Sequence, residues 1–214
     1  MIDAKTMGFL ADSGRDPTRE WLAAHKRDLE DAKADLKQFA SRLIHCVASI
    51  DGRVSSANPD LTNRFARVLG AQLARGVISL TIRTSPDSRA AATYFVHIEP
   101  GASYSGGGAR SPATKFSRLL RQQMMTDTGR WRELVEGTVF RTFFHHGLSD
   151  GTSLATSGFG KNHDAMDSLN LRAFGACRPL PDQLLQSTNA VSEIVRAFAA
   201  ARPLIDFINR ATTR

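Results

Sequence analysis

Residues 93–112 read TYFVHIEPGASYSGGGARSP, and the alternation at the start of this stretch predicts a β-strand. Successive side chains of a strand point to opposite faces of the sheet. One face then carries the apolar set that begins at Tyr94, and the other carries Phe95, His97 and Glu99. Pro100-Gly101 ends the pairing, because a proline-glycine pair favours a turn.

A return strand, a glycine turn and a helix are predicted to follow. Ser103-Tyr104-Ser105 begins the return strand, and Gly106–Gly108 allow a tight turn that a side chain would forbid. Ser111-Pro112 has the capping residue and proline that are typical of a helix start. This stretch alone therefore predicts two neighbouring strands that run into a helix.

The flanking segments upstream predict a long helix and another strand. Apolar residues recur in steps of three and four from Leu22 to Ile50, which predicts one amphipathic helix that ends near Asp51-Gly52. Asp16-Pro17-Thr18 resembles its start, with Asp16 as the cap and Pro17 in the first helical position. Further on, residues 78–82 alternate as a half-buried strand.

Downstream, the pattern predicts helices with one more strand between them. Residues 116–124 have the apolar side of a helix, and a short helix is expected around Trp131. Residues 138–146 alternate weakly and predict a strand. The last helix begins at Asp182, and Pro203 should kink or end it, because proline lacks the amide donor and its ring displaces the preceding turn.

Helices at both ends with strands between them indicate an α+β fold. We expect a mostly antiparallel central sheet flanked by a long N-terminal helix and a C-terminal helix. With 214 residues, the chain is at the upper end of one ordinary domain, so residues 1–214 are interpreted as a single domain.

Charge and cysteine usage bound the function classes. The chain has 28 Lys and Arg against 21 Asp and Glu, a net charge of +7, which favours anionic partners such as nucleic acid or an anionic small molecule. No apolar run is long enough to span a membrane and the start lacks a signal core, so we expect a cytoplasmic protein without membrane contact. Cys46 and Cys177 have no metal-ligand spacing and are expected to be buried free thiols.

An ordered set of short motifs across nearly the whole chain resembles a conserved family of uncharacterised bacterial and fungal proteins, domain of unknown function 2461. The resemblance implies no established activity. It is carried by Phe9-Leu10, Arg19-Glu20-Trp21, Ala24-His25-Lys26, Tyr94 to Gly101, Gly106 to Gly108, Arg121, Gly158-Phe159, His163, Leu169, Phe174 and Pro203-Leu204.

One segment departs from the pattern of this family. The family usually carries a basic block between the first helix and the Tyr94 strand, with Arg-Asp, Arg-Phe-Ser, Asp-Lys and Pro-Tyr-Lys elements. Residues 66–90 of this chain contain no convincing match to that block. Divergence with loss of its role and a local reading-frame error both account for the difference, and no functional residue is transferred into this segment.

The charge favours a binding module for an anionic ligand, either nucleic acid or a phosphorylated metabolite. Exposed basic residues near the predicted helix start would contact the phosphate groups. The candidate ligand-binding residues are Arg83, Arg110, Lys115, Arg118 and Arg121.

The alternative is a small hydrolase-like or transferase-like enzyme. His97 and Glu99 share one strand face and would form an acid/base pair, with His163 as a third catalytic residue. An ordinary solvent-exposed strand face would have the same residues. A catalytic site requires these side chains to converge in the fold, whereas an exposed face does not.

No metal and no cofactor are expected. His163, Asp164 and Asp167 have a spacing that fits either divalent-metal ligands or the acidic first turn of a helix, and we favour the helix. His145-His146 adjoin on the predicted strand and should face opposite sides, which argues against a shared metal.

Overall fold

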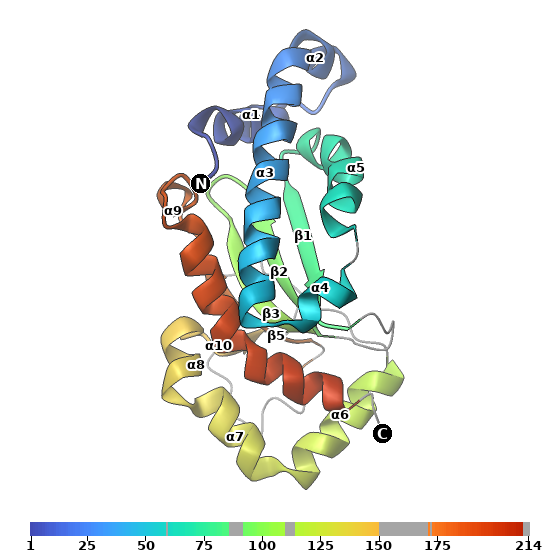
Figure 1. Cartoon of the computed structure of the whole chain (residues 1–214), viewed down its shortest axis with the longest axis vertical. Coiled ribbons are helices and arrows are strands. Elements are labelled where there is room, and N and C mark those ends of the chain that lie inside the picture. The colour runs from blue at the N-terminus through green and yellow to red at the C-terminus, as the bar shows by residue number, and fades with distance from the viewer. Residues whose placement is uncertain (59, 86–91, 110–113, 150–170, 172, 212–214) are drawn as a thin grey trace.

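The computed structural model describes residues 1–58, 60–85, 92–109, 114–149, 171 and 173–211 (Figure 1). An antiparallel sheet forms its centre, in the order β1-β2-β3-β5-β4. The strands are β1 Ile78–Arg83, β2 Thr93–Ile98, β3 Tyr104–Ala109, β4 Leu148–Ser149 and β5 Phe174–Pro179. The helices are α1 Ala4–Arg15, α2 Arg19–Ala24, α3 Lys26–Ile50, α4 Arg53–Ala57, α5 Leu61–Leu73, α6 Thr114–Thr126, α7 Thr128–Glu136, α8 Thr138–Phe143, α9 Asp182–Leu185 and α10 Ala190–Arg210.

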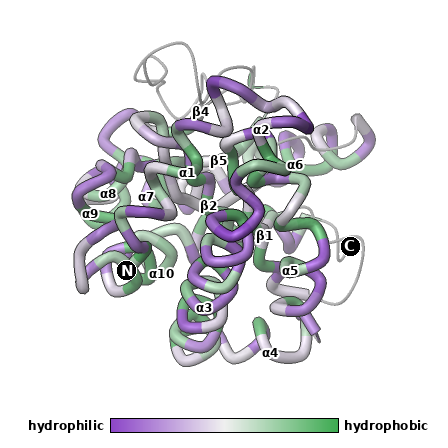
Figure 2. Tube along the Cα trace, turned by 90° about the horizontal axis from the view of Figure 1, so that it is seen from above, coloured by the Kyte–Doolittle hydropathy of each residue, from purple (hydrophilic) through white to green (hydrophobic). Residues whose placement is uncertain are grey.

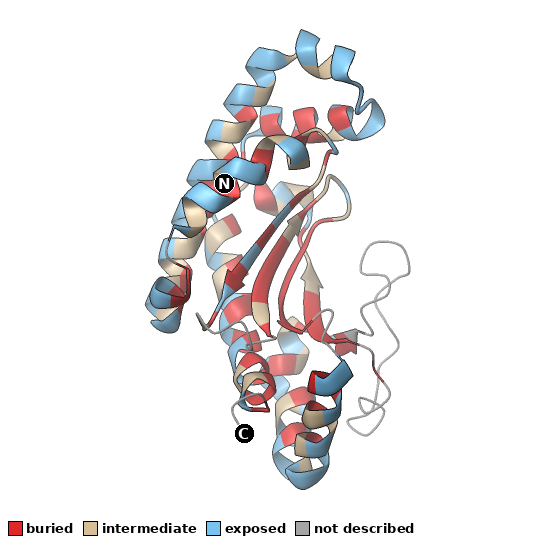
Figure 3. Cartoon of the chain, turned by 90° about the vertical axis from the view of Figure 1, so that its right-hand side faces the viewer, coloured by how far each residue is buried: buried red, intermediate tan, exposed pale blue. Residues whose placement is uncertain are grey.

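The α+β expectation is confirmed, including the antiparallel sheet flanked by the long helix α3 and the C-terminal helix α10. Both helices lie across one face of the sheet (Figure 1). Hydrophobic and hydrophilic residues alternate around α3 (Figure 2). The inner strands are mostly buried, whereas the outer sides of the helices are exposed (Figure 3). Helix α3 stays amphipathic over its whole length because only its inner stripe, such as Leu36 and Leu43, is buried in the core.

Two strands follow their sequence predictions closely. β1 alternates between buried and exposed residues, and β2 pairs with it so that Ser79 lies opposite His97. Tyr94 points toward α10, where its ring stacks on Phe198 with 4.9 Å between centroids. His97 therefore projects from the other face, as the alternation predicts.

The glycine cluster lies inside β3, which corrects the prediction of a turn. Gly107 faces α10, and a Cβ there would lie 2.8 Å from both Ala201 Cβ and Ile205 Cδ1. A Cβ on Gly108 would meet the backbone of β5, and this residue has a φ of +133° that L side chains rarely adopt. The glycines thus allow close approach of a helix and a strand. The predicted helix start at Ser111-Pro112 lies outside the described residues.

The N-terminal helix starts later and is interrupted. Asp16 ends α1, a helix that the sequence reading did not predict, and Thr18 caps α2 by accepting a hydrogen bond from the Trp21 amide at 3.3 Å. The helix breaks at His25, whose ring Nδ1 lies 2.8 Å from the Trp21 carbonyl and whose ring stacks on Trp21. The imidazole of His25 thus contacts a backbone carbonyl oxygen in the last turn of α2. Pro17 precedes the capping residue Thr18 and is not the first residue of the helix.

The strand predicted for residues 138–146 is wrong. Residues 138–143 form α8, because Phe140 and Phe144 are both buried at a helical spacing of four, with their ring centroids 5.1 Å apart. His145 and His146 follow in a turn with their ring centroids 4.1 Å apart, so they do not face opposite sides. Within the described ranges, no group of three or more His, Cys, Asp or Glu residues is placed to hold a metal ion.

The C-terminal region contains a short helix and a long one rather than a single helix. Asp182 starts α9, and α10 begins anew at Ala190. Pro203 lies inside α10, which continues to Arg210 and bends along its length rather than ending (Figure 1). In the part of the chain that the structure covers, no helix has the length and apolar character needed to cross a membrane.

Two side-chain amides occupy the outer edge of β1. Gln72 accepts from the Ser79 amide at 3.0 Å and donates to the Ser79 carbonyl at 3.3 Å. Asn58 does the same for Arg83, accepting at 3.0 Å and donating at 2.7 Å. The described part of residues 66–90, the segment that departs from the family pattern, contains the end of α5 and strand β1. Both pack into the core, where Leu69 and Leu80 are buried.

Candidate functional sites

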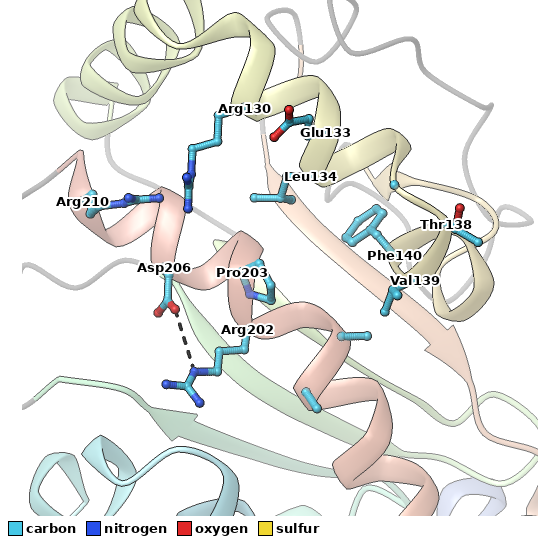
Figure 4. A pocket seen from close by; sticks show the side chains of 13 residues that line it. Arg130, Glu133, Leu134, Thr138, Val139, Phe140, Arg202, Pro203, Asp206 and Arg210 are labelled. Carbon is cyan, nitrogen blue, oxygen red and sulfur yellow. Dashed lines mark ion pairs between the residues drawn. The ribbon is translucent and has the colours of Figure 1, made fainter.

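An open groove between α7, α8 and α10 has a volume of about 730 Å³ (Figure 4). Arg130 and Glu133 reach it from α7, and Arg202, Asp206 and Arg210 reach it from α10. We call this hollow the arginine groove. Its volume lies in the range of small-molecule sites, which is roughly 300–1,000 Å³.

The groove combines charged groups with an apolar wall. Leu134, Val139, Phe140 and Pro203 line it beside the arginines. Val139 is 67% exposed, so this part of the apolar wall is open to solvent. A ligand with an anionic group and an apolar body would match both parts of this lining.

An ion network connects the groove residues Arg202 and Asp206, through Arg53, to the buried Asp51. The Asp51 side chain has no exposed surface; it accepts from Arg53 Nε at 2.8 Å and Nη2 at 2.6 Å, and from the Tyr94 hydroxyl at 3.0 Å. Arg53 also lies 2.7 Å from Asp206 Oδ1, and Arg202 Nε lies 3.9 Å from Asp206 Oδ2. The two aspartates and two arginines of this network balance each other in charge.

The network explains the pKa shifts of its members. Burial would raise the pKa of Asp51, but hydrogen bonds and charge from Arg53, with the Tyr94 hydroxyl, hold that pKa below its ordinary value. Burial, with the nearby charge of Asp51, raises the pKa of Tyr94. The hydrogen bond to Asp51 is the main cause of the raised pKa of Arg53. All three groups therefore keep their charge states near neutral pH.

Arg130 and Arg210 bring two further guanidinium groups to the groove. Beyond the balanced network, Glu133 is the other carboxylate among the residues that line the groove, and it lies on α7 one turn after Arg130 (Figure 4). In that view Arg130 and Arg210 point toward one another from opposite helices. Arg130 forms no hydrogen bond or ion pair with the described part of the chain. Two guanidinium groups that point toward one another favour an anionic ligand at that place.

A second candidate site lies on the face of the sheet away from α10. Ser79 Oγ lies 3.2 Å from His97 Nδ1, and His97 Nε2 lies 2.9 Å from Glu99 Oε2. The His97 ring stacks on Tyr104 with 4.7 Å between centroids and 18° between planes. The hydroxyl of Ser103 bonds both the amide and the carbonyl of Glu99. The histidine and the carboxylate are thus held in one orientation.

The structure brings together only part of the residue set predicted from the sequence. His97 and Glu99 are in direct contact, as their shared strand face predicts. Arg83 is exposed at the end of β1, whereas Lys115 and Arg118 are exposed on α6. His163 and Arg110 lie outside the described residues.

Arg121 has a packing role in the structure. Its Nη2 donates to the Leu171 carbonyl at 2.8 Å, and its guanidinium lies 5.7 Å from the centre of the Phe174 ring. None of Arg83, Lys115, Arg118 and Arg121 lines the arginine groove.

The residues of the arginine groove are not among those predicted from the sequence. Arg202, Asp206 and Arg210 recur in steps of four, which places them on one face of a helix, and this spacing could have identified them. Arg130 has no such signal, because the other arginines that line the groove are distant in the sequence. Ser79 was missed because its role depends on pairing with β2.

These features define an α+β protein with an antiparallel sheet, an arginine-lined groove and a hydrogen-bonded histidine. A family model described as conserved hypothetical protein (DUF2461) matches residues 5–207. The chain therefore belongs to this family, which confirms the resemblance seen in the sequence. Comparisons with curated proteins and with solved structures find no match.

Proposed function

We propose that this protein binds a small anionic molecule, such as a phosphorylated metabolite, in the arginine groove. The observation that carries the proposal is the convergence of Arg130 and Arg210 at a hollow of about 730 Å³ (Figure 4). A guanidinium group binds phosphate or carboxylate through two parallel hydrogen bonds, which makes arginine the preferred residue for such groups. The net charge of +7 would also attract an anion over longer distances.

The hollow favours a small molecule over a polymer. Nucleic acid binding requires an extended row of phosphate contacts. Lys115, Arg118 and Arg83 are exposed outside the groove and would serve a polymer better, so they provide the contrasting set of variants. The cytoplasmic location expected from the sequence is part of this proposal.

The test is calorimetric titration with inorganic pyrophosphate at low and moderate salt. Replacing Arg130 by Gln should weaken binding about 10- to 100-fold, because a hydrogen bond to a charged group contributes about 1.5–3 kcal/mol. Arg132→Gln is the matched control, since Arg132 is exposed on the same helix and does not line the groove. Equal affinities for these two variants would exclude the groove as the site.

A parallel titration with a labelled single-stranded oligonucleotide addresses the polymer. We expect weak binding that Arg130→Gln leaves unchanged. Tight, strongly salt-dependent binding that Arg118→Gln weakens would instead place a nucleic acid on α6 and contradict the proposal.

A hydrolase-like or transferase-like activity is a second candidate function, favoured by the hydrogen bond between His97 and Glu99 at 2.9 Å. A histidine held by a carboxylate is suited to general acid/base catalysis. A panel of ester and phosphoester substrates tests it, with loss of turnover in His97→Gln as the expected result.

A further inference from the structure

We infer that Ser79 is the nucleophile of an ester-cleaving site formed with His97 and Glu99. The inference rests on the second candidate function and is independent of the arginine groove. Its basis is a continuous hydrogen-bonded array, with Ser79 Oγ 3.2 Å from His97 Nδ1 and His97 Nε2 2.9 Å from Glu99 Oε2. Such an array is the arrangement by which proteins activate a serine hydroxyl.

The backbone explains why the side chains of Ser79 and His97 meet. They are direct partners in the antiparallel pair β1–β2. The amide and carbonyl of Ser79 bond outward to Gln72, so this pair is of the type without mutual backbone hydrogen bonds. Side chains lie closer in that type of pair. The contact is therefore built into the register of the sheet.

The carboxylate determines the direction of the hydrogen bonds. An ionised Glu99 can only accept, so His97 Nε2 carries the proton and donates it. His97 Nδ1 then holds a lone pair and accepts from the Ser79 hydroxyl. The imidazole is thus in the tautomer that a general base requires.

Access and orientation support the same role. Ser79 is exposed, whereas the His97 side chain is 14% exposed and is stacked on Tyr104. Glu99 is 38% exposed, and Ser103 fixes its backbone at both polar groups. A substrate can reach the hydroxyl, while the base behind it is held in place.

The reaction balances with water as the only co-reactant. Ser79 Oγ attacks the carbonyl carbon of a small carboxylic ester while its proton passes to His97 Nδ1. The carbon–oxygen bond to the leaving alcohol breaks, and His97 returns the proton to that alcohol. Water, deprotonated by His97, then releases the acid from the acyl-serine and restores the hydroxyl. Glu99 stabilises the imidazolium that forms in each half of the reaction.

The test combines p-nitrophenyl acetate hydrolysis with a fluorophosphonate probe and peptide mass spectrometry. We expect a probe adduct on Ser79 and a loss of at least about 100-fold in hydrolysis for Ser79→Ala and His97→Gln. Glu99→Gln should hydrolyse p-nitrophenyl acetate more slowly than the wild-type protein. Thr81→Ala is the matched control, because Thr81 is exposed on the same face of β1, and it should leave the rate unchanged. Circular dichroism checks that each variant is folded.

The outcomes separate the nucleophile from the activity. Turnover that His97→Gln abolishes and Ser79→Ala retains would overturn Ser79 as nucleophile and leave the second candidate function in place. Absence of both adduct and turnover in the folded wild-type protein would overturn both. An adduct on another residue would also refute the assignment.

Discussion

Replacing Asn58 by Ala should destabilise the protein by about 2–3 kcal/mol. The Asn58 amide donates to the carbonyls of Val54 at 2.8 Å and Arg83 at 2.7 Å, and it accepts from the Arg83 amide at 3.0 Å. Each such bond contributes about 0.5–1.5 kcal/mol, so three bonds give about 1.5–4.5 kcal/mol. Asn58 is only 7% exposed, but the Arg83 side chain is exposed, so water will replace part of the loss at the sheet edge.

The assay is urea unfolding followed by circular dichroism. With a slope of about 1–3 kcal/mol per molar urea, the midpoint should fall by roughly 1 M. Gln122→Ala on the exposed side of α6 is the control and should stay within about 0.5 kcal/mol of wild type. A change below about 0.5 kcal/mol for Asn58→Ala at an unchanged slope would refute the idea that this amide completes the edge of β1.

Three further predictions concern packing, pH and thiol reactivity. Gly107→Ala should reduce the free energy of unfolding by about 1–3 kcal/mol and lower the thermal midpoint, because the new Cβ would lie 2.8 Å from two side-chain carbons of α10. Gly8→Ala is the control and should not destabilise the protein, since nothing lies within 4 Å of the added Cβ. Because the pKa of Asp51 is lowered, its carboxylate stabilises the fold fully above the ordinary pKa of about 3.9, and this stabilisation is lost as the pH falls through the lowered pKa. Asp51→Asn should therefore flatten the acid side of a plot of unfolding free energy against pH. An unchanged acid side would contradict this reasoning. Burial raises the pKa of the Cys177 thiol to about 12, so Ellman's reagent should modify the half-buried Cys46 first and Cys177 only on unfolding. A fast reaction that persists in Cys46→Ser would contradict this prediction.

The strands and long helices could be predicted from the sequence because burial gives them a local period. β1 alternates along its whole length, and α3 keeps an apolar stripe, since each packs one side on the same core. The contact of His97 with Glu99 also follows from a period of two. These are properties of a single element and need no knowledge of its neighbours.

Two of the failures have causes that lie elsewhere in the chain, and one comes from a weak local pattern. The sequence predicts a turn at Gly106–Gly108, because no local pattern shows that α10 and β5 approach these residues closely. Residues 138–146 alternate weakly, and the spacing of Phe140 and Phe144 was outweighed by that alternation. The arginine groove joins Arg130 to residues of α10 far along the sequence, so only the tertiary structure reveals it.

The side-chain amides of Asn58 and Gln72, which bond to the outer edge of β1, also limit how this protein can bind a partner. Many domains capture an extended peptide by adding it as a further strand to an open sheet edge. Here Asn58 and Gln72 already occupy the two ends of the outward row of β1, and the strand at the other edge, β4, has only two residues. Within the described sheet, neither edge offers a long free template for another chain, which also guards against edge-to-edge aggregation. Recognition by this fold is therefore expected to depend on the shape and charge of its side chains rather than on backbone pairing.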